Sequence, residues 1–322
     1  MKILVTGAAG QVGTDLLPLL VERGDEVTVF DIVPRPDGCP KAVTWVRGDI
    51  TLAPNVYDAV REAQPDLIYH LAAILSARGE AMPHQAYRVN MDGTLNVLEA
   101  ARLFGVEQVF YASTIAAFGP GLPDLVPNEV SMRPTTMYGV TKVAGELLGE
   151  YYQEKFGLDF RGVRFPGLLN AGVPGGGTSD YALFMYVDGL TKGHYASFAE
   201  PRARIHYMYM HDALRAILEL AAAPKERLKR SVYNIAAVSP TAEEFADPEL
   251  GITAADIRAV FDAARAMSAA EYRDNGAELQ QKLMPLYMPT EAAGDRILVD
   301  FFMQRAMPKV LGDKLEAMQE EG

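Results

Sequence analysis

The segment Gly7-Ala8-Ala9-Gly10-Gln11-Val12-Gly13 constrains the fold of this chain more than any other segment. The apolar run at 2–6 before it predicts a buried strand, and the amphipathic pattern at 11–23 after it predicts a helix that stops at Gly24. Glycines at such a junction permit a tight turn, let a pyrophosphate approach the backbone and let the helix pack closely on the strand. The segment therefore predicts a dinucleotide-binding turn that includes Gly7, Gly10, Gln11 and Val12.

Strand-like and helix-like segments alternate after this turn. The pattern predicts strands at 26–31, 43–47, 67–71, 108–112 and 159–164, and helices at 55–63, 86–104 and 138–156. The strand segments at 67–71 and 108–112 are largely apolar, which is typical of parallel strands covered by helices on both faces. We therefore expect an α/β fold with a Rossmann-type, doubly wound parallel sheet.

The alternation ends after Arg164. The sequence predicts an irregular stretch at 166–178, a helix at 181–191, a short connection and a helix at 208–222, a strand at 231–237, and mostly helix beyond Pro240. We expect a nucleotide-binding domain of residues 1–164 plus about 205–237. The remaining residues, 165–204 and 238–322, are expected to form a smaller, mostly helical C-terminal substrate lobe.

Acidic side chains follow two of the predicted strands. Asp31 ends the second strand, where a carboxylate can accept hydrogen bonds from the ribose 2′-OH of the adenosine and would repel a 2′-phosphate. This favours NAD over NADP, although Arg35 lies close enough in sequence to keep NADP open. Asp49 and Ile50 follow the third strand and either contact the adenine or form a turn before the next helix.

Composition excludes several classes of function. The formal net charge of -12 argues against a nucleic-acid partner and against an anionic membrane surface. No apolar stretch approaches the roughly 18 residues of a transmembrane helix. A single cysteine, Cys39, cannot form an internal disulfide, and the spacing of the five histidines fits no metal site. We expect a cytoplasmic protein with a small-molecule substrate and no metal.

Tyr138 and Lys142 carry the chemistry predicted for the site. On a helix their four-residue spacing puts both side chains on one face, one turn apart. A phenol with a pKa of about 10 is a poor base at neutral pH, and a neighbouring ammonium favours the phenolate. The pair therefore predicts a proton acceptor whose pKa Lys142 lowers towards the operating range.

The glycine turn, Asp31 and the Tyr138/Lys142 pair together resemble the extended short-chain dehydrogenase/reductase superfamily over residues 1 to about 240. Further matches fall at the strand ends and in the long helix, namely His70-Leu71-Ala72-Ala73, Asn90, Ser113-Thr114 and Phe165-Pro166-Gly167. The resemblance implies NAD contacts at Leu71, Ala72, Ala73, Asn90, Ser113, Phe165 and Pro166. It also implies that Tyr138 and Lys142 contact the cofactor, with Lys142 holding the nicotinamide ribose, and that Thr114 binds the developing carbonyl oxygen. His70 is expected to be a packed neighbour of the site.

Within that superfamily, several segments resemble the short-chain type of L-threonine 3-dehydrogenase. They include the residues 75–80, 118–120, 137–142 and 177–182. The resemblance implies oxidation of the β-hydroxyl of L-threonine, or of a similar hydroxy acid, to a ketone, with Ser76 and Thr178 on the polar groups of the substrate. Backbone N–H groups of the Gly-rich loop around Gly177 suit a carboxylate. The segment after about residue 246 departs from that group of enzymes.

Two alternatives stay open. The superfamily is rich in nucleotide-sugar 4-epimerases and dehydratases with tightly bound NAD, whose diphosphate substrates are usually clamped by Arg or Lys. Between Phe165 and Glu200 the only such residue is Lys192. A non-catalytic NAD-binding regulator is the other alternative. The helices at 86–104 and 138–156 resemble those that pair in dimers of the superfamily, so we expect a homodimer.

Overall fold

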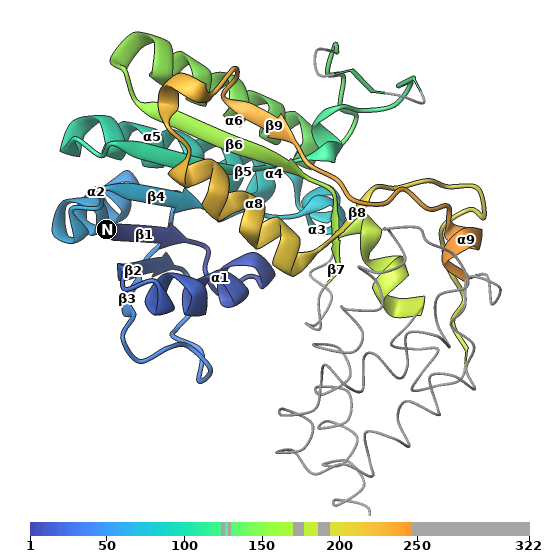
Figure 1. The fold of residues 1–322 in the computed structure, drawn as a ribbon, viewed down its shortest axis with the longest axis horizontal. Coiled ribbons are helices and arrows are strands. Elements are labelled where there is room, and N and C mark those ends of the chain that lie inside the picture. Colours follow the sequence, from blue (N-terminus) through green and yellow to red (C-terminus); the bar gives the residue numbers. More distant parts are fainter. Residues whose placement is uncertain (124–125, 128–129, 170–176, 186–193, 247–322) are drawn as a thin grey trace, which may run out of the picture. The chain divides into compact units, whose positions relative to one another are not determined.

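A parallel sheet of seven strands forms the centre of the first compact unit in a computed structural model that describes residues 1–246 except 124–125, 128–129, 170–176 and 186–193 (Figure 1). Its strands are β1 (Lys2–Thr6), β2 (Glu26–Asp31), β3 (Thr44–Arg47), β4 (Leu67–His70), β5 (Gln108–Thr114), β6 (Asp159–Phe165) and β9 (Val232–Asn234). Their order is β3-β2-β1-β4-β5-β6-β9. Because β1 lies between β2 and β4, the sheet grows outward in both directions from this point, where such sheets bind dinucleotides. The predicted Rossmann-type sheet is confirmed.

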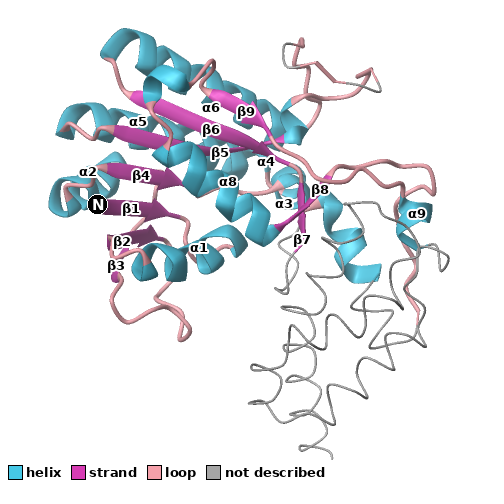
Figure 2. Ribbon diagram, in the orientation of Figure 1, coloured by secondary structure: helices cyan, strands magenta, loops and turns pink. Residues whose placement is uncertain are grey.

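Helices cover both faces of this sheet (Figures 1 and 2). The helices α2 (Ala53–Ala63), α5 (Gly93–Phe104) and α6 (Met137–Phe156) lie on one face, and α1 (Gln11–Glu22) and α8 (Met210–Ala222) lie on the other. A core on the first face joins the helices to the strands through buried side chains such as Val60, Leu98, Ile68, Val109 and Phe160. Each of these large side chains contributes roughly 1.5–3 kcal/mol by leaving water. This packing fixes the carboxyl ends of the strands, where most of the predicted site residues lie.

The helix predicted at 86–104 is interrupted. The structure has a short helix α4 (Pro83–Tyr87), a π-helical turn at Arg88–Asp92, and then α5. The wider turn points the buried Asn90 side chain at Ile74, whose N–H donates to Asn90 Oδ1 at 2.8 Å and whose C=O accepts from Asn90 Nδ2 at 3.0 Å. A hydrophobic pattern carries no sign of such a turn, because the extra residue is absorbed without a change in composition.

Of the described residues, the first compact unit comprises those within 1–166 together with 177–178 and 211–235, and the second comprises 167–169, 179–185, 194–210 and 236–246. In its described part, β7 (Gly167–Leu169) pairs in parallel with β8 (Tyr207–Tyr209), and Tyr181, Leu183 and Tyr207 form its core. The prediction that the chain is irregular from residue 166 was therefore wrong at β7, where Gly167 N–H donates to His206 O at 2.9 Å. Residues 181–185 are helical, α9 covers Ala242–Ala246, and the helical predictions at 186–191 and after 246 lie outside the described residues.

The described helices include none with the length and apolar character needed to cross a membrane.

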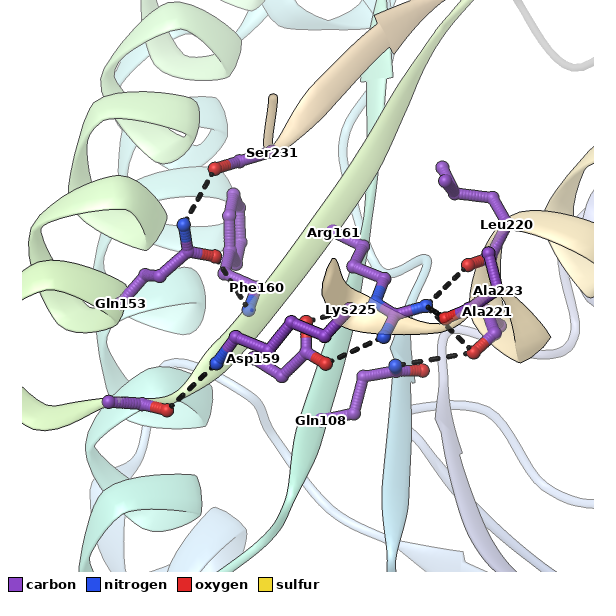
Figure 3. Close-up of polar contacts among 11 residues, drawn as sticks. Gln108, Gln153, Asp159, Phe160, Arg161, Leu220, Ala221, Ala223, Lys225 and Ser231 are labelled. Atoms are coloured by element: carbon purple, nitrogen blue, oxygen red, sulfur yellow. Dashed lines mark hydrogen bonds and ion pairs between the residues drawn. The ribbon is translucent and has the colours of Figure 1, made fainter. Parts of the chain in front are cut away.

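Arg161 joins the end of α8 to the sheet (Figure 3). Its guanidinium donates to the carbonyl oxygens of Leu220 at 2.7 Å, Ala221 at 3.1 Å and Ala223 at 2.5 Å, and it forms a two-pronged ion pair with Asp159. The last carbonyls of a helix have no partner within the helix, so the buried arginine satisfies groups that would otherwise be costly to bury.

Replacing Arg161 with methionine is expected to lower the free energy of unfolding by about 3 kcal/mol, because it leaves buried carbonyl groups and the Asp159 carboxylate without their partner. Urea unfolding followed by circular dichroism measures this loss. The matched control is Arg215→Met on α8, because Arg215 is exposed and its ion pair with Asp212 is worth less than about 1 kcal/mol. An equal loss of unfolding free energy in the two variants would show that the buried contacts of Arg161 stabilise the fold no more than an exposed ion pair does.

Candidate active site

The glycine turn between β1 and α1 leaves no room for side chains. Gly7 has a φ of 70°, and a Cβ added there would lie 2.5 Å from Ala72 Cα, in the segment that follows β4. A Cβ added at Gly13 would collide with the backbone of Ala8. Gly10 is the N-cap residue of α1 and brings no side chain, so Gln11 and Val12 present the backbone at the helix N-terminus. A turn of this kind fits the pyrophosphate of a dinucleotide.

Asp31 is held beside this turn. It ends β2, is buried, and its carboxylate accepts from the N–H of Ala9 at 2.9 Å and of Val33 at 3.2 Å. Arg35, the sequence feature that kept a 2′-phosphate open, donates instead to the carbonyl oxygens of Val43 and Pro40, at 3.2 and 2.7 Å. The carboxylate therefore has a fixed position, whereas the guanidinium is bound within its own loop, an arrangement that fits NAD.

The remaining predicted cofactor residues follow β3, β4, β5 and β6. Asp49 accepts from Thr51 N–H at 2.9 Å and forms a turn before α2, so its alternative reading as a turn residue has direct support. Ile50 is buried beside Gly93 of α5. Leu71, Ala72 and Ala73 follow β4, Ser113 lies at the end of β5, and Phe165 and Pro166 lie at the end of β6, all in the first unit.

Asn90 and His70 serve as packed supports. Asn90 Nδ2 also donates to Thr141 Oγ1 at 3.0 Å, so this side chain ties the segment after β4 to α6. The His70 ring lies between the hydroxyls of Thr6 and Thr94, with Nδ1 and Nε2 at 2.8 and 3.0 Å. Burial lowers the pKa of His70 to about 3, and the charge of Lys142 acts in the same direction. The neutral, enclosed imidazole agrees with its predicted role as a packed neighbour.

Tyr138 and Lys142 lie on the first two turns of α6. The side chain of Thr136 caps this helix by accepting from Gly139 N–H at 3.1 Å. Lys142 is buried, and its Nζ lies 5.7 Å from the centroid of the Tyr138 ring and donates to Ala112 O at 2.6 Å. Thr114 lies close enough to the Tyr138 phenol to lower its pKa, against the larger effect of burial. The structure therefore brings the three predicted catalytic residues together.

The pKa values correct one prediction from the sequence. Burial raises the pKa of Tyr138 to about 12, against the smaller opposing effect of the neighbouring Thr114 side chain. Burial also lowers the pKa of Lys142 to about 7, with the charge of Glu146 opposing it. In the protein alone, the lysine therefore does not bring the phenol towards neutrality, because burial disfavours both charged forms.

Two predicted substrate residues meet in the first unit. The N–H of Thr178 donates to Ser76 Oγ at 3.2 Å, and Ser76 opens the short helix α3 (Ser76–Ala81). Gly177 precedes Thr178, which begins the 3-10 turn Thr178–Asp180. The hydroxyl of Ser76 can still donate, because it is the acceptor in this bond.

Three residues near Lys142 were missed in the sequence. Tyr111 places its ring centroid 4.7 Å from Lys142 Nζ, and Glu146 and Arg164 form a buried ion pair. Glu146 could have been found by extending the Tyr138/Lys142 face of the helix by one more turn. The sequence carries no local sign of Arg164, which comes from β6.

The fold is a Rossmann-type sheet with a dinucleotide-binding glycine turn and a carboxylate held at Asp31. The site brings together Thr114, Tyr138 and Lys142. These features define an NAD-dependent oxidoreductase of the short-chain dehydrogenase/reductase type. The chain belongs to the NAD dependent epimerase/dehydratase family, whose model matches residues 3–236. NAD is its cofactor.

The chain is similar to known proteins of this kind. It is 42% identical to an uncharacterised epimerase/dehydratase of Staphylococcus aureus (strain USA300) over 74% of this chain and 76% of the relative. Among solved structures, a GalE-like L-threonine dehydrogenase from Cupriavidus necator is 38% identical, with a TM-score of 0.72 over 80% of this chain and 82% of the other. L-Threonine 3-dehydrogenase from Trypanosoma brucei is 33% identical, with a TM-score of 0.75 over 97% and 98%. UDP-glucose 4-epimerase from Thermus thermophilus, in complex with NAD, is 25% identical, with a TM-score of 0.70 over 94% and 99%.

Proposed function

We propose that this protein oxidises the β-hydroxyl of L-threonine, or of a closely similar small hydroxy acid, to the corresponding ketone, which for threonine is 2-amino-3-ketobutyrate. The observation that carries the proposal is the junction of Ser76 with Thr178 in the same unit as Thr114, Tyr138 and Lys142. The likeness to two L-threonine dehydrogenases, at 33 and 38% identity, supports this substrate class.

Each of the three side chains has its own part in this reaction. Tyr138 accepts the O–H proton of the substrate, and the Thr114 hydroxyl donates a hydrogen bond to the oxygen as it becomes a carbonyl. Lys142 holds the ribose hydroxyls of the cofactor and places positive charge beside the phenol. Bound NAD would supply the oxidant, taking the hydrogen of the β C–H bond with its two electrons, and would add a positive ring that favours the phenolate.

The substrate end of the site is proposed to bind the amino-acid groups. Ser76 Oγ can donate to the substrate carboxylate, since it is the acceptor in its bond with the N–H of Thr178. A hydroxy acid with its charge next to the carbinol fits these groups better than a large diphosphate, for which the segment between Phe165 and Glu200 offers only Lys192.

The assay is direct. Purified protein is incubated with NAD and L-threonine, and NADH is followed by its absorbance, with L-serine and D-threonine as substrate controls. We expect turnover with L-threonine and much less with the controls. Tight NAD binding without turnover from pH 7 to 10 would overturn the proposal. Interconversion of UDP-glucose and UDP-galactose without net NADH would instead establish the epimerase alternative, which the likeness to the Thermus thermophilus enzyme keeps in view.

A homodimer is proposed from the outer face of α5 and α6. Large apolar side chains are exposed on both helices, at Leu95, Leu103, Phe104, Val140, Leu147, Tyr151 and Phe156. A group of exposed apolar side chains on two packed helices is typical of an interface, and a second copy of the same chain offers the same side chains. Light scattering after size exclusion is expected to give twice the mass of the 322-residue chain, and Leu147→Glu is expected to give single chains. A wild-type mass of one chain would contradict the proposal.

A further inference from the structure

A buried charge cluster lies one helical turn beyond Lys142. Arg164 of β6 holds the Glu146 carboxylate in a two-pronged ion pair, with Nη2 to Oε2 at 2.6 Å and Nε to Oε1 at 3.0 Å. The Ser113 hydroxyl donates a short hydrogen bond to the same carboxylate, and Arg164 Nη1 donates to Asn234 Oδ1 at 3.0 Å. Glu146 and Ser113 are each only 2% exposed, and Arg164 is 9% exposed.

The cluster lies beside the two elements that position Lys142, which are its own helix α6 and the end of β5. Glu146 follows Lys142 by four residues on α6, so the two side chains share a face of the helix. Ser113 follows Ala112, whose carbonyl accepts from Lys142 Nζ, and precedes Thr114. Burying an ion pair seldom adds stability over apolar residues of similar size, so its place next to the site suggests a role beyond packing.

We propose that Glu146, held in place by Arg164 and Ser113, is a positioning residue that keeps Lys142 protonated and fixed against Ala112 beside Tyr138. The proposal rests on the proposed role of Lys142 as the partner of Tyr138. Glu146 acts through the lysine and needs no contact with substrate or cofactor.

The surroundings of Lys142 leave Glu146 as its source of negative charge among the described residues. The titratable and charged groups around it are His70 of β4, Tyr111 of β5, Tyr138 and Glu146 of α6, Arg164 of β6 and, farther along α6, the exposed Glu150. His70 is neutral, and burial raises the pKa of both tyrosines well above neutrality. Burial lowers the pKa of Lys142, and Glu146 acts against that effect.

Substitutions of the two ion-pair residues are expected to shift the pKa of Lys142 in opposite directions. Glu146→Gln leaves the positive charge of Arg164 unpaired near the lysine, so the pKa of Lys142 should fall by roughly one unit or more. Arg164→Gln leaves the negative charge of Glu146 unpaired, so the pKa of Lys142 should rise by a similar amount. If the cluster served only to pack the sheet against α6, the two substitutions would shift the pKa of Lys142 in the same direction or not at all.

The titration is measured on the full chain without substrate. Lysines are labelled with ¹³C at Cε, their chemical shifts are followed from pH 5 to 11 by NMR, and the Lys142 signal is the one lost in Lys142→Arg. Glu150→Gln is the matched control, because it removes the same charge one turn farther along α6, where solvent screens it. We expect this control to move the Lys142 titration by less than about 0.3 unit.

The outcome decides the proposal without reference to the substrate. Opposite shifts in Glu146→Gln and Arg164→Gln support it, whereas no shift, or shifts of one sign, in folded variants overturn it. Should an uncharged variant unfold, Glu146→Asp withdraws the carboxylate by one methylene, and an unchanged Lys142 titration in that variant overturns the proposal. Absence of threonine oxidation by the wild type would overturn the proposed function but not this titration.

Discussion

Replacing Tyr138 with phenylalanine is expected to lower kcat for L-threonine oxidation by roughly 10²–10⁴-fold. The substitution removes the phenol hydroxyl and keeps the ring, whose centroid lies 5.7 Å from Lys142 Nζ. The proton of the substrate hydroxyl then has no side chain to accept it, whereas the glycine turn and Asp31 are untouched. NAD affinity is therefore expected to stay within about twofold, since the pyrophosphate and ribose contacts are unchanged.

Two measurements separate chemistry from folding in this variant. NADH formation gives kcat, and quenching of intrinsic fluorescence on addition of NAD gives the affinity. Tyr69→Phe is the matched control, because it removes a buried hydroxyl from β4 at a position outside the proposed machinery. Full activity in Tyr138→Phe would overturn the mechanism, and an equal loss in Tyr69→Phe would point to a general effect on folding.

Local pattern was enough to predict the cofactor half of this molecule. The strand at 2–6, the glycine turn and the helix at 11–22 follow from apolar runs and from the conformational freedom of glycine, which act over a few residues. The position of Asp31 was predictable because it depends only on where the second strand ends. The same holds for Tyr138 and Lys142, because helical spacing alone places them on one face.

What the sequence could not predict depends on packing between distant segments. The ion pair of Glu146 with Arg164 needs α6 to cross β6, which is set by the whole sheet order rather than by either segment. The raised pKa of Tyr138 and the lowered pKa of Lys142 depend on how deeply the first turns of α6 are enclosed. The turn at Asn90 exists because its side chain binds Ile74 and Thr141, two partners that tertiary structure brings to it.

Replacing Lys142 with methionine is expected to abolish turnover and yet to stabilise the protein at neutral pH. The pKa of Lys142 is about 7 in the folded protein, against 10.5 ordinarily. Between these values the unfolded chain carries a proton that the folded chain does not, so wild-type stability rises with pH across this window. Below it, the buried ammonium costs on the order of 4 kcal/mol, part of which methionine recovers. Both residues of the ion pair between Glu146 and Arg164 remain in the variant, so neither of these charges loses its partner.

The stability gain of Lys142→Met should therefore shrink as pH rises. Urea unfolding at pH 6.5, 8 and 9.5 is expected to show the largest advantage at the lowest pH and little near pH 10, a narrowing of at most about 1.4 kcal/mol per pH unit. Lys155→Met is the matched control, because Lys155 is exposed in the last turn of the same helix and its loss should change stability by less than about 0.5 kcal/mol. A Lys142→Met variant less stable than the wild type at every pH would mean that the lysine is a structural support, and its burial would then need no functional reason. A gain that is lost with rising pH would mean that the fold tolerates a costly buried charge, as expected where that charge serves the chemistry of Tyr138.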